Sequence, residues 1–294
     1  MNKYKIAGLV LQLDWSKEMI HNNFESFACS DSEPTDLLFQ LEVETVKVEP
    51  TKDPIIHSSY LTVYDTEEGF LLMYPTSLNL NASLYNKANK SATLYLTNEL
   101  TKNAATKVTN TVEGIELNTL DYIFFAIRDL FFIHMQQHHI LAVHSSSIIY
   151  RDKAYLFSAC SGTGKTTHTN LWVERFGVEI LDGDVAAVTI EDGQAIAYGL
   201  PWCGTSNRFV NRRMVLGGII FLAQSCHNSL SRLTPFEATL RLAARCFTPT
   251  WTKEQSEINL FVAEEIAPKI LTAYLGCLPN QEAVDMIKEL IDAQ

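Results

Sequence analysis

The pattern of hydrophobic and polar positions changes character near residue 118. Before it, short apolar runs separated by turn residues predict strands at residues 36–48, 60–64, 70–74 and 92–96. Glu67-Glu68-Gly69 predicts a hairpin turn, whereas residues 79–91 are rich in Asn, Ser and Lys and predict a loop. We therefore expect a β-rich N-terminal region over residues 1–117.

From residue 118 onward, helical and extended periods alternate. Residues 120–134 place apolar side chains on most faces of a helix, which predicts a buried helix. Arg128 and Asp129 interrupt it, and they either pair with each other or reach a cleft. The remaining pattern predicts strands at 140–145, 147–150, 153–158, 178–181, 186–190, 195–198, 215–223 and 270–274, and helices at 165–176, 235–246, 254–269 and 281–291. This succession predicts an α/β (α+β) domain over residues 118–294.

Composition narrows the class of partner. The 294 residues are 47% hydrophobic, which is enough for a packed core. The 23 basic and 34 acidic residues give a net charge of −11, which argues against a nucleic-acid partner or an anionic membrane surface. The six cysteines include no CxxC pair. No stretch has transmembrane length, and the apolar run at 6–11 is too short for a signal peptide, so we expect a cytoplasmic protein.

A phosphate-binding loop is predicted between the strand at 153–158 and the helix at 165–176. Its sequence is Ala159-Cys160-Ser161-Gly162-Thr163-Gly164-Lys165-Thr166, with Ala159 where the usual pattern has glycine. Glycine lets such a loop curl with its N–H groups inward, and the helix N-terminus adds partial positive charge. We expect Lys165 to reach the β- and γ-phosphates of a nucleotide and the Thr166 hydroxyl to ligate Mg²⁺. The expected nucleotide-binding residues are Ser161, Gly162, Thr163, Gly164, Lys165, Thr166, Thr167 and His168.

Two carboxylates follow the next predicted strand. Phosphoryl transfer requires a carboxylate that holds the metal or activates the nucleophile. Asp184 is the first candidate for either role, and Asp182 is the second. The alternative is a β-turn built from Asp182-Gly183-Asp184.

Histidine and arginine provide further candidates. His144, on a strand that leads to the loop, either approaches the γ-phosphate or is a core residue. His168 either flanks the nucleotide or covers the surface of its helix. Arg208, Arg212 and Arg213 follow the predicted strand at 195–198, where an arginine would stabilise a transferring phosphoryl group or lie in a solvated basic loop.

Together these residues resemble the HPr kinase/phosphorylase superfamily, whose fold is related to that of ATP-dependent phosphoenolpyruvate carboxykinase. The matching segments are His144-Ser145-Ser146, 157–168, Leu171-Trp172, Asp182-Gly183-Asp184, 199–204 and 233–238. The resemblance runs from about residue 118 to the end and is closest to uncharacterised HPr-kinase-like bacterial proteins. It implies a mixed central sheet with flanking helices, ATP and Mg²⁺ as cofactors, an essential acid at Asp184 and a site residue at His144.

The chain departs from the family pattern in two places. The family often has two consecutive acids where this chain has Gly183-Asp184, and the Glu-x-Arg-Gly-x-Gly segment of HPr kinases is not evident, which argues against HPr as the substrate. We therefore expect an ATP- and Mg²⁺-dependent kinase that phosphorylates a hydroxyl of a protein serine or of a small molecule. A nucleotide-binding regulatory or assembly module with weak or no catalysis is the alternative. A carboxykinase-type lyase ranks below both, because those enzymes are much longer. The sequence leaves the acceptor and the oligomeric state open.

Overall fold

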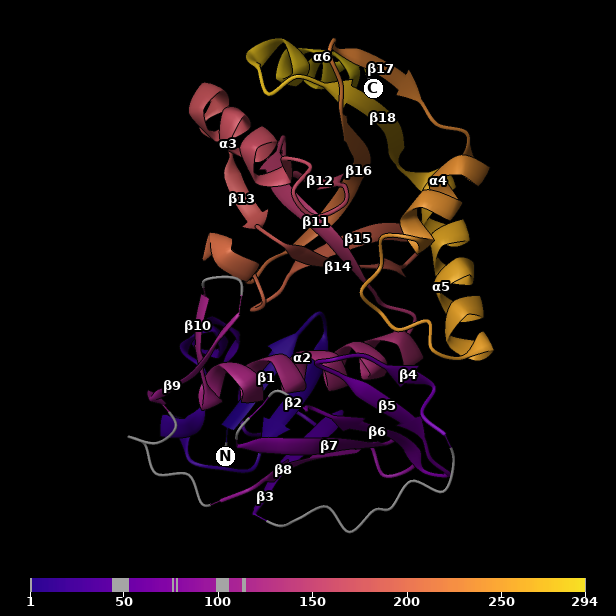
Figure 1. Cartoon of the computed structure of the whole chain (residues 1–294). Helices are drawn as coiled ribbons and strands as arrows, with labels where there is room; N and C mark the ends of the chain where they lie inside the picture. The colour runs from indigo at the N-terminus through magenta and orange to yellow at the C-terminus, as the bar shows by residue number, and fades with distance from the viewer. Residues whose placement is uncertain are drawn as a thin grey trace. The chain divides into compact units, whose positions relative to one another are not determined.

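The computed structural model describes residues 2–43, 53–75, 77, 79–98, 106–112 and 115–293. The chain divides into two compact units, Met1–His134 and Met135–Gln294. Figure 1 shows the elements of each. The division falls within helix α2 (Thr119–Gln137), later than the predicted boundary after residue 117.

The first unit contains an eight-stranded mixed sheet in the order β1-β2-β3-β8-β7-β6-β5-β4. The pairs β2–β3 and β3–β8 are parallel. The strands are β1 Asn2–Ile6, β2 Leu9–Leu13, β3 Leu37–Val43, β4 Ile56–His57, β5 Thr62–Asp65, β6 Gly69–Met73, β7 Leu80–Asn86 and β8 Ser91–Leu96. The described residues of this unit also form two short 3-10 helices, η1 (Lys17–Met19) and η2 (Asn22–Phe27), and a separate pair of strands, β9 (Val108–Val112) and β10 (Ile115–Asn118). The prediction of a β-rich N-terminal region is confirmed.

Two local predictions for this unit need correction. The loop expected at 79–91 is wrong, because β7 and the start of β8 occupy it. Its polar residues are buried with partners: the hydroxyls of Ser83 and Tyr74 are 2.8 Å apart, and Asn86 Nδ2 donates to Glu68 Oε2 at 2.6 Å. Of the strand predicted at 36–48, β3 covers Leu37–Val43, and residues 44–48 lie outside the described residues.

Helix α2 packs within the first unit along most of its length. The Phe124 ring stacks on His21 at 4.1 Å and meets Phe24 edge-on at 5.4 Å. The Tyr85 hydroxyl lies 3.0 Å from His134 Nδ1. These aromatic contacts explain why residues 119–134 group with the N-terminal unit.

Arg128 and Asp129 of α2 pair with each other. Arg128 donates from Nε and Nη2 to Asp129 Oδ1 at 3.0 and 2.9 Å. Of the two alternatives left open for these residues, the structure shows the pair.

The second unit contains a mixed sheet in the order β12-β11-β14-β15-β16-β18-β17, with β13 also paired to β11. Because β12 pairs in parallel with β16 as well, the strands β11, β14, β15, β16 and β12 form a closed circuit. The strands are β11 Leu141–Tyr150, β12 Lys153–Ser158, β13 Glu179–Asp182, β14 Val185–Glu191, β15 Gln194–Gly199, β16 Arg213–Gln224, β17 Ser229–Arg232 and β18 Leu271–Cys277. The two strands predicted at 140–150 are one continuous strand.

Helices cover both faces of this sheet (Figure 1). They are α3 Lys165–Phe176, α4 Pro235–Ala243, α5 Lys253–Ile266 and α6 Gln281–Asp292, with short 3-10 helices η3 Gly204–Ser206 and η4 Ala267–Lys269. Alternate residues of β12 face opposite cores: Leu156 packs in the cluster that α4 and α5 close, and Phe157 in the cluster that α3 and α6 close. The phosphate loop runs from the end of β12 to α3, on the face of the sheet that α3 and α6 cover. Among the described residues, no helix is long and apolar enough to cross a membrane.

Candidate functional site

The loop predicted to bind phosphate connects β12 to α3. Gly162 and Gly164 have φ angles of 76° and 109°, which residues with a Cβ rarely adopt. Gln224, at the end of β16, donates from Nε2 to the carbonyl oxygens of Gly162 and Thr163 at 3.3 and 3.4 Å. The loop is thus curled by glycine and fastened to the strand beside β12.

Lys165 is the first residue of α3, and its ammonium group lies against the start of the loop. Nζ is 2.9 Å from His144 Nε2 and 3.4 Å from the Ala159 carbonyl oxygen. The residue is only 8% exposed. Burial lowers the pKa of Lys165, and the nearby Asp184 carboxylate acts in the opposite direction. Within the described residues these two acceptors do not satisfy three N–H donors, so the ammonium retains capacity for an anionic ligand.

His144, on β11, lies between Lys165 and Asp184. Its Nε2 is 3.5 Å from Asp184 Oδ1. Phe247 stacks on the imidazole, with ring centroids 4.6 Å apart and the planes inclined by 24°. The His144 backbone N–H donates to the Arg245 carbonyl oxygen at 2.9 Å. The imidazole Nε2 thus lies within reach of both the Lys165 ammonium and the Asp184 carboxylate.

Asp184 is the accessible acid of the site. It lies in the turn between β13 and β14, and its backbone oxygen accepts from the Ser145 N–H at 2.9 Å. Its side chain is 37% exposed, against 16% for His144. Lys165, His144 and Asp184, which come from a helix, a strand and a turn, therefore converge directly beside the loop.

Asp182 occupies a different position from Asp184. It is fully buried, and its carboxylate accepts from three backbone N–H groups: Oδ1 from Asp184 at 3.0 Å and Val185 at 3.1 Å, and Oδ2 from Leu200 at 2.8 Å. Burial raises the pKa of Asp182, and the three N–H donors oppose that shift. The Asp182 carboxylate thus fixes the turn that carries Asp184.

Two glycines bring the loop after β15 over this turn. A Cβ at position 183 would collide with the Ser206 hydroxyl. Gly204 has a φ of 59°, and a Cβ there would lie 2.9 Å from Asp184 Cγ. The helix η3 therefore closes over Gly183 and touches Asp184, which leaves no room for a second acid at position 183.

His168 does not flank the loop, and its prediction as a nucleotide-binding residue is corrected. The side chain is 3% exposed and packs on Phe157, with ring centroids 4.6 Å apart. Its Nε2 accepts from Trp172 Nε1 at 3.3 Å. Burial lowers the pKa of His168 to about 4. It is a neutral core histidine, because its position in α3 points it toward the apolar sheet face.

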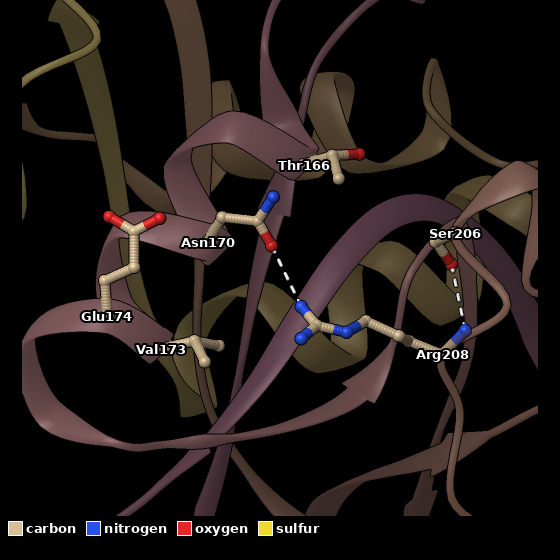
Figure 2. Close-up of a pocket in the computed structure, with 6 residues that line it drawn as sticks. All are labelled: Thr166, Asn170, Val173, Glu174, Ser206 and Arg208. Atoms are coloured by element: carbon tan, nitrogen blue, oxygen red, sulfur yellow. Dashed lines mark hydrogen bonds between the residues drawn. The ribbon is translucent and has the colours of Figure 1, made fainter.

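Of the three candidate arginines, Arg208 lies at the site. Arg212 pairs with Glu179, and Arg213 pairs with Glu191 at 2.8 Å. Arg208 instead donates from Nη1 to Asn170 Oδ1 on α3 at 2.9 Å (Figure 2). It lines an open pocket of about 390 Å³ whose lining is Thr166, Asn170, Val173, Glu174, Ser206 and Arg208.

The residues expected to hold Mg²⁺ are Thr166 and Asp184. Thr166 is exposed at the start of α3, and Asp184 presents a partly exposed carboxylate. Mg²⁺ in nucleotide sites takes few protein oxygens and completes its shell with phosphate and water, so this donor pair fits that ion. Within the described part of the chain, no three His, Cys, Asp or Glu side chains cluster as a self-sufficient metal site.

The remaining predicted residues surround the helix start: Ser161, Gly162, Thr166 and Thr167 are exposed, and Thr163 and Gly164 are half-buried. The sequence reading missed Phe247, Gln224, Ser206 and Asn170. Asn170 alone had a usable signal, since it lies one helical turn from Thr166 on α3. The others come from distant segments that the sheet brings to the site.

Comparison with known proteins does not identify a family for this chain. No family model and no curated protein matches the chain. Among solved structures, the chain is similar to the Hpr(Ser) kinase/phosphatase from Coxiella burnetii, with 12% identity and a TM-score of 0.31, over 52% of this chain and 94% of that one. At that TM-score the likeness carries no argument, and the functional conclusion rests on the geometry of the site.

Proposed function

We propose that this protein is an ATP- and Mg²⁺-dependent kinase that transfers the γ-phosphoryl group to a hydroxyl acceptor. The observation that carries the proposal is the convergence of Lys165, His144 and Asp184 beside a glycine-curled loop at a helix N-terminus. A buried cation that lacks a full set of acceptors, next to an accessible carboxylate, is the arrangement that a transferring phosphate requires.

The loop and Lys165 supply phosphate binding. The first N–H groups of α3 have no partner within the helix, and they offer donors to phosphate oxygens. The Lys165 ammonium exchanges its contact with His144 for a phosphate oxygen, which relieves its desolvation. Thr166 and Asp184 would hold Mg²⁺, which would neutralise charge on the phosphate oxygens when bound.

Asp184 and His144 supply the proton chemistry. As the acceptor oxygen forms its bond to the γ-phosphorus, the bond from that phosphorus to the β–γ bridging oxygen breaks, and its electron pair stays on the nucleoside diphosphate. The acceptor proton moves to Asp184. His144 Nε2, 3.5 Å from Asp184 Oδ1, orients that carboxylate and is itself fixed by Phe247.

A second candidate function is a nucleotide-binding module without transfer. One observation favours it: η3 closes over position 183, so in the described turn from Asp182 to Asp184 only Asp184 is an accessible acid. The Asp184 carboxylate then has to hold the metal ion and also accept the proton from the acceptor hydroxyl.

Nucleotide binding and nucleoside diphosphate release, measured with Mg-ATP and a pool of hydroxyl acceptors, test the proposal. Asp184→Asn is expected to lower turnover by about 10²-fold or more, because it removes the base. It also removes a metal oxygen, so Mg-ATP affinity is expected to fall, while affinity for ATP without Mg²⁺ is kept because the loop is retained. Asp192→Asn, in the exposed β14–β15 turn, is the matched control and is expected to match the parent. Binding without turnover would favour the module, and absence of binding would overturn both functions.

A further inference from the structure

The open pocket between α3 and the 206–208 segment contains opposite charges. Arg208 donates to Asn170 through one guanidinium nitrogen, Nη1. Glu174, one turn further along α3, is exposed, and within the described residues its carboxylate has no hydrogen-bond or ion-pair partner. In Figure 2 the guanidinium and this carboxylate lie on either side of Asn170. The lining thus presents one cationic and one anionic group to the same volume.

The pocket adjoins the proposed phosphoryl-transfer site. Thr166, in its lining, is the residue after Lys165. On the opposite wall, Ser206 covers Gly183, and Gly204 of the same η3 helix touches the Asp184 carboxylate. The pocket therefore shares its η3 wall with the turn that carries Asp184.

We propose that this pocket binds the phosphate acceptor and that the acceptor is a free amino acid that carries a hydroxyl group. The inference rests on the proposed kinase function. Arg208 binds the carboxylate, because a guanidinium presents paired N–H donors to a planar anion. Glu174 binds the ammonium group. A volume of about 390 Å³ accepts a molecule of this size together with water.

The charges of the pocket disfavour other acceptor classes. A sugar phosphate or another polyanion meets Glu174 as a like charge, in a protein of net charge −11. A neutral sugar offers no oppositely charged group to either charge of the pocket. A zwitterion satisfies both.

The reaction follows from this placement. The amino-acid hydroxyl oxygen bonds to the γ-phosphorus, and the bond to the bridging oxygen breaks toward the nucleoside diphosphate. Asp184 takes the hydroxyl proton. The products are an O-phosphorylated amino acid and a nucleoside diphosphate.

The pocket is tested directly by L-serine binding to the full chain, measured by titration calorimetry in the absence of nucleotide. Arg208→Ala is expected to weaken L-serine binding by about tenfold or more, since it removes a charge-assisted pair. Arg212→Ala, whose side chain pairs with Glu179, is the matched control and is expected to bind normally. Ethanolamine, which lacks the carboxylate, and glycerate, which lacks the ammonium, are expected to bind weakly. Glu174→Gln is expected to reduce the preference of the pocket for L-serine over glycerate.

Transfer from labelled ATP to L-serine, L-threonine and L-homoserine is the second readout. Arg208→Ala is expected to raise KM for the amino acid with little change in ATP affinity. Normal ATP binding with no amino-acid binding, or transfer only to protein acceptors, would overturn this inference and leave the kinase proposal standing. Absence of ATP binding would overturn the proposed function. L-serine binding measured without nucleotide would still show whether the pocket binds an amino acid.

Discussion

At the scale of residues, the site separates charged groups by their access to a ligand. Asp182 and Asp184 are two positions apart, yet three backbone N–H groups occupy the first and the second is partly exposed beside His144. The sequence pattern ranks Asp184 ahead of Asp182 but does not show that only Asp184 is accessible. Their difference arises from the N–H groups that bind Asp182. Two belong to the same turn, but the third comes from Leu200, which follows β15 and is distant in sequence.

Because His168 is buried, we predict that the free energy of unfolding depends on pH. Its pKa in the folded chain is about 4, below the ordinary value of 6.5, because burial disfavours the charged ring. Its contribution to the free energy of unfolding is complete above pH 6.5. That contribution falls by about 1.4 kcal/mol for each pH unit as the pH drops toward 4, because the unfolded chain binds the proton and the folded chain does not.

Denaturant unfolding between pH 7 and pH 4 measures this loss. In His168→Gln, whose amide oxygen can still accept from Trp172, the decline is expected to be shallower than in the parent. His227→Gln, at an exposed position, is expected to keep the parent slope. Equal slopes in all three proteins would show that His168 is not buried neutral.

At the scale of elements, η3 and the phosphate loop form the two sides of the site. The strand–loop–helix unit is contiguous in sequence, so its glycines and Lys165 predicted it correctly. The closing side was not predictable, since η3 reaches Asp184 only because β14, β15 and β16 turn the chain back. The failed loop prediction at 79–91 has a related cause: Ser83 and Asn86 are polar, yet side chains from Tyr74 and Glu68 satisfy them inside the sheet.

Gly204→Ala tests the closing side. The substitution adds a Cβ 2.9 Å from Asp184 Cγ at a φ of 59°, so it is expected to destabilise the chain by about 1 kcal/mol and to reduce phosphoryl transfer strongly. Nucleotide affinity is expected to stay near the parent value, because the loop at 159–164 is untouched.

Gly193→Ala is the control for backbone strain. Gly193 has a φ of 77°, and a Cβ there meets nothing within 4 Å, so it imposes a similar conformational cost away from the site. It is expected to lose stability and keep activity. Equal activity in the two variants would contradict the role assigned to η3. Thermal unfolding and initial rates provide the measurements.

At the scale of the whole molecule, the proposed chemistry belongs to one of the two units. Periodicity predicted a β-rich region followed by a mixed α/β region, and both are present. It placed the boundary before α2, because the helix's apolar pattern does not say which core it joins. Phe24, Phe124 and Tyr85 decide that, through contacts between residues far apart in sequence.

Hydrogen exchange with and without Mg-ATP tests whether the nucleotide binds to the second unit. At a ligand concentration 100 times Kd, binding stabilises the liganded state by about 2.7 kcal/mol. We expect slower exchange in peptides that cover the phosphate loop, the start of α3 and the turn at Asp184. We expect little change in β1 to β8, and protection confined to those strands would contradict the assignment.

The most direct test of the central claim is the affinity of Lys165→Met for Mg-ATP, measured by calorimetry. Methionine keeps the alkyl stem and removes a charge that burial disfavours, so unfolding is expected to match the parent. Affinity is expected to fall by about tenfold or more, because charge-assisted contacts to phosphate are lost. Lys153→Met, at the exposed start of β12, is expected to bind normally. A folded Lys165→Met protein with parental affinity for Mg-ATP would contradict the phosphate-loop assignment.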